Sequence, residues 1–342
     1  MMPSLAEPAG QAAGATEAAI RPQGRVGNAA LLIVSKYGTL IAMAIMIAFF
    51  AVVVPNGAFF TTNNLLSIVN QSALTAIVAF GLTMVLVVGE FDLSIGYAAS
   101  LAGVLVTGFI AKQGLPIIVA VVVTVLLGGG IGAANGVLVT KARVNAVVAT
   151  LGVGTILVGL AFGYTAGSPI TQLPEEFTWI TLARFLGVQN PIWFMLIVGV
   201  VLWVLLNRTP MGQRIQAVGA NPKAAQLAGI RVDRAKITAF MMAGACAALT
   251  GVLLASILGS GTVSAADGYL MDSFAAVFLG SATLRDGEFH ILGTLVGVLV
   301  VSVGFNGLAL MGTPTFWQYV FKGGILVFAV ALSTIARRYS RR

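Results

Sequence analysis

Long apolar runs separated by short polar stretches fill the chain between residues 37 and 336. Most runs approach the roughly 20 residues that a helix needs to cross a bilayer. Strands of a membrane barrel would be shorter and would alternate apolar with polar positions, so the pattern predicts helices. We expect ten membrane segments, at residues 37–55, 65–88, 94–111, 115–139, 144–166, 190–206, 236–258, 272–284, 290–311 and 316–336.

The eighth segment, residues 272–284, is shorter than the others. At about 1.5 Å per residue it cannot cross the ~30 Å of hydrocarbon in a bilayer. We therefore expect it to be re-entrant or broken and to lie among its neighbours. The fold predicted from the pattern is an all-α integral membrane protein, a polytopic helical bundle of about ten transmembrane segments with one short or re-entrant.

Composition and charge agree with a membrane protein. The chain is 58% hydrophobic and 9% charged, whereas a soluble domain carries about 25% charged residues. The net charge of +8 does not indicate nucleic acid, because basic residues in a membrane protein mark cytoplasmic loops. The lone cysteine, Cys246, lies in the apolar run 237–258 and is expected to be an inert packing residue.

The distribution of Lys and Arg predicts the orientation of the bundle. With both termini in the cytoplasm, only Lys112, Arg184 and Lys322 of the 19 basic residues fall on or near the outer face. Residues 1–30 are predicted to be a disordered cytoplasmic tail. Residues 31–336 form the expected transmembrane domain, and residues 337–342 form a basic cytoplasmic tail.

Two sets of glycines recur every four residues, which puts each set on one face of a helix. The sets are Gly128, Gly132 and Gly136, and Gly159, Gly163 and Gly167. We expect a neighbouring helix to pack closely against each set. A surface that slides during conformational change is the alternative.

Polar side chains inside the predicted spans are few, and each could line a solute path or bond to another helix. They are Asn70, Gln71, Ser72, Thr75, Thr150, Thr155 and Asn306. Because Asn70 and Gln71 are adjacent, they point in different directions on a helix, and at most one of them is expected to face a path.

The stretch "VGEFDLSIG", residues 88–96, contains two carboxylates between two apolar runs. Gly89 and Gly96 flank the charges and permit a bend. Asp92 and Ser94 resemble a helix start, where a side-chain oxygen accepts from free amides of the third segment. We interpret Asp92 as a cap at a helix break, with direct solute contact as the alternative. The sequence alone does not explain Glu90.

The longest inner connection, residues 207–236, contains a predicted short helix. Asn221 can cap it, Pro222 suits its first turn, and Gly229 ends it. A capped helix held at the membrane surface offers a rigid element that a partner protein can bind and displace. An ordinary solvated basic loop is the alternative.

Four stretches, in this order along residues 35–336, resemble the permeases of ABC importers of the ribose, xylose and arabinose type. "NNLLSIVNQSALTAIVAFGLTMVLVVGEFDLSIGYAASLAGV" (63–104) resembles their N-terminal signature, and "VNAVVATLGVGTILVGLA" (144–161) resembles a later segment. "TPMGQRIQAVGANPKAAQLAGIRVDRAK" (209–236) resembles their coupling-helix loop. "DGYLMDSFAAVFLGSATLRDGEFHILGTLVGVLVV" (267–301) resembles their Gly-Tyr-x-x-Asp stretch.

The resemblance implies a division of labour among several subunits. The permease, as a homodimer or paired permease, forms the translocation path in the bacterial inner membrane. A cytoplasmic ATPase with two fused nucleotide-binding halves binds ATP and Mg and docks on the coupling helices. A periplasmic or lipid-anchored binding protein delivers the sugar. The coupling positions carry over onto Gly219, Asn221, Pro222, Lys223, Ala224, Ala225 and Gly229.

The chain departs from this family at two points. Glu90 stands where the family usually has a glycine, and residues 281–288 replace its glycine-rich turn. These departures leave the cargo open to alternatives, namely a nucleoside, a polyol or an autoinducer furanose.

We find no phosphate-binding loop, catalytic constellation or metal-ligand set in the sequence. His290, beside Glu288 and near Arg285 and Asp286, is expected to lie in a solvated turn with a local ion pair; a proton relay is the alternative. The alternative from another class is a self-sufficient secondary transporter, which needs charges embedded in the membrane.

Overall fold

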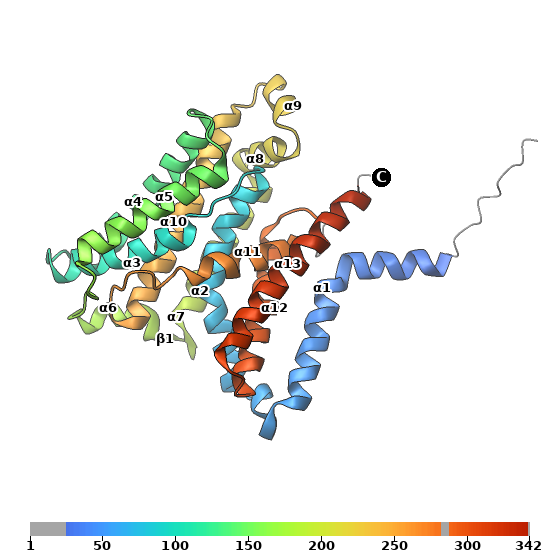
Figure 1. Cartoon of the computed structure of the whole chain (residues 1–342), viewed down its shortest axis with the longest axis horizontal. Helices are drawn as coiled ribbons and strands as arrows, with labels where there is room; N and C mark the ends of the chain where they lie inside the picture. The colour runs from blue at the N-terminus through green and yellow to red at the C-terminus, as the bar shows by residue number, and fades with distance from the viewer. Residues whose placement is uncertain (1–24, 282–286, 341–342) are drawn as a thin grey trace, which may run out of the picture.

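The computed structural model describes residues 25–281 and 287–340. These residues fold as a bundle of helices with one short β-hairpin (Figure 1). The elements are α1 (Arg25–Val53), η1 (Pro55–Phe60), α2 (Thr62–Val87), α3 (Ile95–Ala111), α4 (Ile117–Thr140), α5 (Ala146–Thr165), α6 (Glu175–Leu182), β1 (Arg184–Phe185), β2 (Val188–Gln189), α7 (Asn190–Arg208), α8 (Pro210–Ala220), α9 (Pro222–Leu227), α10 (Val232–Leu258), α11 (Gly268–Ser281), α12 (Ile291–Leu310) and α13 (Thr315–Ser340).

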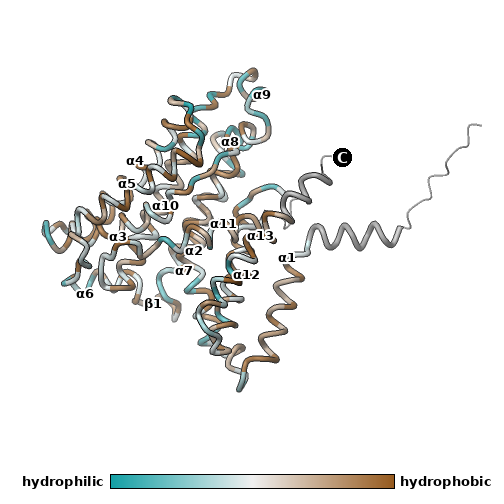
Figure 2. The backbone as a smooth tube through the Cα atoms, in the orientation of Figure 1, coloured by the Kyte–Doolittle hydropathy of each residue, from teal (hydrophilic) through white to brown (hydrophobic). Residues whose placement is uncertain are grey.

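Within the described residues, each of the ten predicted segments coincides with a helix, and apolar residues run along these helices (Figure 2). Residues 282–284 of the predicted eighth segment lie outside the described part. Within the described part of the chain, 6 helices are long and apolar enough to cross a membrane, namely α2, α4, α5, α7, α10 and α12. Shorter apolar helices are Tyr37–Val53, Ile95–Ala111 and Thr315–Ala331. The predicted short eighth segment is confirmed as α11, whose 14 residues span only about 21 Å.

The predicted tails lie only partly within the described residues. Helix α1 begins at Arg25, within the range 1–30, and residues 1–24 lie outside the described part. Helix α13 runs through the start of the range 337–342 and ends at Ser340.

Helix α2 is the central element of the bundle. Every residue from Ser72 to Leu86 is buried, and the helix packs against α7, α10, α11 and α12. This stretch has no charged residue. Two of its hydroxyls are bonded: the Oγ of Ser72 donates to the carbonyl of Ile68 over 2.6 Å, and Thr83 Oγ1 donates to the carbonyl of Ala79 over 2.7 Å. A helix that is apolar on all sides needs protein or lipid around it, and this part of α2 is surrounded by protein.

Glycines allow α4 and α10 to approach each other closely, as predicted for the first glycine set. A Cβ atom on Gly132 would overlap the carbonyl oxygen of Phe240, and one on Gly136 would lie 2.7 Å from the Cα of Ile237. Gly244 of α10 meets the backbone of Gly128 in the same manner. The contact is therefore between the two backbones.

Among the described residues, no neighbouring helix packs against the second glycine set, so the prediction of close packing within this chain was wrong. A Cβ atom on Gly159 or Gly163 would meet nothing within 4 Å. Gly167 lies beyond the end of α5 and has a φ of +78°. The four-residue spacing identifies a common face, but it does not reveal whether that face points into the bundle. The prediction for Cys246 is confirmed, because its side chain is buried against Gly81.

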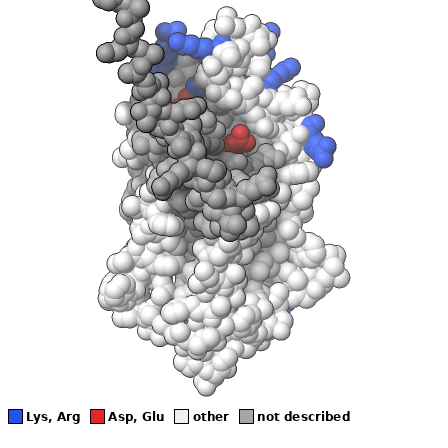
Figure 3. Space-filling model, turned by 90° about the vertical axis from the view of Figure 1, so that its right-hand side faces the viewer, with Lys and Arg blue, Asp and Glu red and all other residues white. Residues whose placement is uncertain are grey.

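The bundle has two distinct ends. Helices α8 and α9 lie at one end, here called the α9 end, and α6 with the β-hairpin lies at the other, the α6 end (Figure 1). Figure 3 shows Lys and Arg side chains gathered toward the α9 end of one face, above a body with few charges. The basic residues from the end of α7 to the first turns of α10 are Arg208, Arg214, Lys223, Arg231, Arg234 and Lys236.

Candidate functional site

The connection between α7 and α10 contains the predicted short helix. Asn221 is its N-cap, and the Asn221 Oδ1 accepts from the amide of Ala224 over 3.0 Å. Pro222 occupies the first turn, where its missing N–H costs nothing. Gly229 follows the helix with a φ of +81°, a conformation that suits glycine. The cap, the helix and its ending are confirmed.

The two faces of α9 differ in exposure. Ala225 is only 5% exposed and packs in the core, so it supports the helix and does not face outward. Leu227 is 90% exposed, and Lys223 and Ala224 are exposed beside it. Sequence reasoning missed Leu227; the available signal was a leucine in an otherwise polar and small-residue helix. A single exposed apolar side chain is ordinary on a protein surface and does not by itself identify a partner.

Helix α8, which was not predicted, connects α9 to the core. Its residues Gly212, Ile215 and Val218 are buried and form one face. Thr209 caps it by accepting from the amide of Gly212 over 3.2 Å. Gly219 lies against the end of α2 so closely that a Cβ atom would overlap the carbonyl oxygen of Val87. Gly219, predicted as a coupling residue, is thus the contact between α8 and α2.

Directly after this contact, residues 88–94 form the break between α2 and α3. Gly89 has a φ of +84° and makes the bend, as predicted. Gly96 does not bend the chain: it lies inside α3, and a Cβ atom there would be 3.1 Å from the carbonyl oxygen of Asp267. The close approach of α3 to the start of α11 explains this glycine.

Glu90 now has a partner. Its Oε1 lies 2.5 Å from the Nζ of Lys236, and the two side chains are 18% and 19% exposed. The ion pair joins the break to the first turns of α10, directly after the connection that contains α8 and α9. Sequence reasoning missed the pair because its members are 146 residues apart.

Asp92 is 1% exposed and holds the turn before α3. Its Oδ1 accepts from the amide of Ser94 over 2.9 Å and from the Ser94 hydroxyl over 2.6 Å. The predicted cap by Asp92 is confirmed for the amide of Ser94, the first residue of the predicted third segment, whereas the side chain of Ser94 itself makes no cap bond. The Ser94 hydroxyl instead accepts from Asn135 of α4 over 2.8 Å.

Thr150 of α5 holds the same break. Its Oγ1 accepts from the amide of Leu93 over 3.0 Å and donates to the carbonyl of Ala146 over 2.8 Å. Two further helices, α4 and α5, thereby fix the peptide segment that leads into α3. These bonds satisfy backbone and side-chain groups that water cannot reach.

Two of the remaining polar candidates form hydrogen bonds with other side chains. Asn306 bonds to a residue of another helix, and Gln71 bonds to a residue of its own helix. The amides of Asn306 and Asn64 exchange two hydrogen bonds, of 3.0 and 2.8 Å. Gln71 donates to Ser67 over 3.1 Å. Thr75 of α2 is buried. Thr155 of α5 donates to the carbonyl of Leu151 over 3.0 Å.

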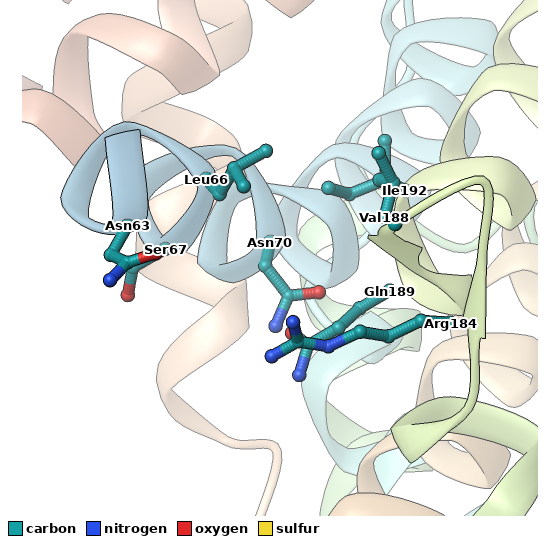
Figure 4. A pocket seen from close by; sticks show the side chains of 9 residues that line it. Asn63, Leu66, Ser67, Asn70, Arg184, Val188, Gln189 and Ile192 are labelled. Atoms are coloured by element: carbon teal, nitrogen blue, oxygen red, sulfur yellow. The ribbon is translucent and has the colours of Figure 1, made fainter. Parts of the chain in front are cut away.

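Asn70, in contrast, lines a cavity of about 460 Å³ at the α6 end (Figure 4). It is therefore the member of the adjacent pair Asn70 and Gln71 that borders a space able to hold a solute.

His290 is the N-cap of α12. Its Nδ1 accepts from the amide of Gly293 over 2.9 Å, and the side chain is 6% exposed. The predicted solvated turn is therefore wrong for this residue, and the local ion pair with Arg285 and Asp286 lies outside the described residues.

A further charge pair lies between two helices. Lys322 of α13 and Asp272 of α11 are 2.7 Å apart. A paired charge inside a bundle is a tie between helices and does not by itself make an ion path.

The family described as branched-chain amino acid transport system / permease component matches residues 64–330. The chain belongs to this permease family. The permease is 38% identical over 296 residues to the ribose import permease protein RbsC of Escherichia coli (strain K12), covering 85% of this chain and 91% of that protein. It is 37% identical over 302 residues to RbsC of Bacillus subtilis (strain 168), covering 88% and 93%.

The L-arabinose ABC transporter permease protein AraH of Azospirillum brasilense is 32% identical over 325 residues, covering 95% of the permease and 95% of that protein. No solved structure matches the permease. The matched region contains both the connection with α8 and α9 and the break between α2 and α3. The permease is thus a multi-pass membrane protein.

Proposed function

We propose that this permease is the membrane subunit of an ATP-driven importer that moves a monosaccharide across the bacterial inner membrane by alternating access. The single observation that carries the proposal is the 38% identity to a ribose import permease over 85% of the chain. The family match at residues 64–330 contains the capped α9 helix and the break at residues 88–94.

The partners of the permease follow from the same relationship. A second permease copy completes the path, and a cytoplasmic subunit with two fused nucleotide-binding halves binds ATP and Mg. A periplasmic or lipid-anchored binding protein delivers the solute. We assign α9 with its exposed Leu227, Lys223 and Ala224 as the surface that meets the ATPase. Among the large apolar side chains of the described residues, that of Leu227 is the most exposed, which supports its assignment to a contact with another protein.

The orientation of the bundle rests on its charges. The α9 end carries the basic residues of the longest connection, and Lys and Arg are enriched in cytoplasmic loops. We infer that the α9 end and both termini lie in the cytoplasm and that the α6 end faces outward. In this orientation the bundle has ten membrane segments, and α11 enters from the outer side without crossing the whole bilayer.

The mechanism follows a continuous set of contacts. A displacement of α9 carries α8 with it, because Asn221 ends one helix and begins the other. Gly219 transmits the displacement to the end of α2, where the break begins. The Glu90–Lys236 ion pair couples the break to α10. The start of α3 then shifts relative to α11, which changes the side on which the path is open.

Uptake in sealed vesicles tests this function. Vesicles that contain the permease and the ATPase subunit, with ATP enclosed and the binding protein outside, should accumulate the sugar, and omission of the ATPase should abolish accumulation. Sugar accumulation driven by an ion gradient without the ATPase would show a secondary transporter and contradict the proposal.

A further inference from the structure

A polar cavity lies at the α6 end, between the first turns of α2 and the β1–β2 hairpin. Its volume is about 460 Å³, within the range of small-molecule sites. Asn63, Ser67 and Asn70 project from α2 at the spacing of one helix face. Arg184 and Gln189 come from the hairpin. Figure 4 shows the Asn70 amide directed toward the side chains of Arg184 and Gln189.

Most of these polar groups are not paired with protein. In the described part of the chain, no hydrogen bond or ion pair joins the side chains of Asn63, Asn70, Arg184 or Gln189 to another residue. The Oδ1 of Asn70 is buried without a partner. A buried polar atom is unfavourable unless a solute or a water molecule pairs with it. Rotation about the last torsion of an asparagine is soft, so either amide atom can turn toward the cavity.

The mixture of donors and acceptors selects the ligand chemistry. The three amides of Asn63, Asn70 and Gln189 each offer both a donor and an acceptor, and Arg184 offers donors only. An anion accepts hydrogen bonds and cannot satisfy the amide oxygens. A hydroxyl group both donates and accepts, so neighbouring hydroxyls on one molecule can pair with amides and guanidinium together.

We propose that this cavity is a subsite for a polyhydroxylated, uncharged solute on the outer side of the permease. The inference rests on the proposed function for its orientation and deepens it. The cavity would be the first polar binding site on the translocation path, formed by α2 and the hairpin. Leu66, Val188 and Ile192 supply apolar contact for the carbon face of such a solute.

Protection of an engineered thiol tests the subsite. Cys246 is the lone cysteine of the chain and is buried, so Ser67→Cys introduces a single accessible thiol at the cavity. The variant is assembled with the ATPase subunit in vesicles and labelled with a membrane-impermeant maleimide. D-ribose, L-arabinose and D-allose are the probes, and malate is the anionic comparison. A sugar at ten times its Kd should slow labelling by about tenfold, because only the empty site reacts.

Two variants make the result specific. Ser168→Cys, an exposed position outside the cavity, should react at the same rate with and without sugar. Asn70→Leu in the Ser67→Cys background should remove most of the protection. The inference is overturned if no sugar slows labelling, if malate alone does, or if both thiols are slowed equally. ATP-driven uptake by the unmodified permease is measured in parallel, so uptake without protection overturns the subsite alone, and absence of uptake counts against the proposed function.

Discussion

The two carboxylates of the break have separate roles at the scale of single residues. Glu90 reaches the Nζ of Lys236 at 2.5 Å, whereas Asp92 accepts two bonds from Ser94. Both residues hold the chain where α2 gives way to α3, but only Glu90 binds a basic side chain. Because the pair is partly buried, removal of one partner lowers stability more than removal of both, since a single remaining charge is left without a partner.

Removal of the Lys236 cation alone should therefore destabilise the break between α2 and α3. Lys236→Met leaves the Glu90 carboxylate mostly buried without its partner and should lower stability by about 1–3 kcal/mol. The double variant Lys236→Met with Glu90→Gln should recover part of this loss, since neither charge remains. Thermal unfolding of the purified permease and sugar uptake measure the effect. A double variant that is less stable than Lys236→Met would contradict the assignment.

Substitutions at Asp92 separate hydrogen bonding from charge. Asp92→Asn keeps an oxygen that can accept from the amide of Ser94, whereas Asp92→Leu leaves that amide and the Ser94 hydroxyl without their acceptor. We expect the leucine variant to lose about 1–3 kcal/mol of stability and most uptake, and the asparagine variant to lose less. The two variants are compared by uptake per unit of protein in the membrane. Equal losses would mean that the charge itself is used.

At the scale of helices, the α4–α10 contact depends on the absence of side chains. Gly132→Ala forces a methyl group onto the carbonyl of Phe240 and should destabilise the permease by about 1–3 kcal/mol. Gly130→Ala is the matched control on the same helix, because a Cβ atom there meets nothing within 4 Å. It should be neutral or slightly stabilising, by up to ~1 kcal/mol.

Thermal unfolding in detergent, with both variants beside the unmodified permease, measures this difference. If Gly132→Ala unfolds at the same temperature as Gly130→Ala, the backbone contact does not stabilise the bundle.

The helices themselves could be predicted from the sequence because each signal was local. The apolar runs gave the segments, and Asn221, Pro222 and Gly229 gave α9. Helix α8 was missed because residues 210–220 mix polar and apolar positions, and their buried face becomes apparent only against α2. The outward face of Gly159 and Gly163 was missed for the same reason, since spacing defines a face but not its neighbour.

The candidate site was only partly predictable. The bend at Gly89 and the capping residue Asn221 follow from local backbone preferences. The pairing of Glu90 with Lys236, the bond from Leu93 to Thr150 and the amide pair of Asn64 with Asn306 join distant parts of the chain. Such contacts depend on the packing of several helices, which a single sequence does not specify.

At the scale of the whole molecule, a series of contacts joins the two ends of the bundle. The α9 end offers a basic surface with an exposed leucine, and the α6 end offers a polar cavity. Between them lie α8, the end of α2 and the break, connected by the Gly219 contact and the Glu90–Lys236 pair. In the proposed mechanism, these contacts carry a displacement of α9 to the break between α2 and α3.

Leu227 should be a main contact of the ATPase subunit. Leu227→Asp puts a charge on the surface that meets the partner and should weaken binding of the ATPase by about tenfold or more. The permease itself should fold normally, because Leu227 is 90% exposed. Leu186→Asp is the matched control, since Leu186 is 77% exposed in the hairpin at the opposite end. Co-purification with the ATPase subunit measures binding.

The most direct test of the account is ATP-driven sugar uptake by vesicles that contain Leu227→Asp or Leu186→Asp, with ATP hydrolysis measured in the same vesicles. We expect Leu227→Asp to lose uptake and solute-stimulated hydrolysis together, while Leu186→Asp keeps the stimulated hydrolysis. Normal uptake by Leu227→Asp, with the ATPase still bound, would contradict the assignment of α9 as the surface through which ATP drives transport.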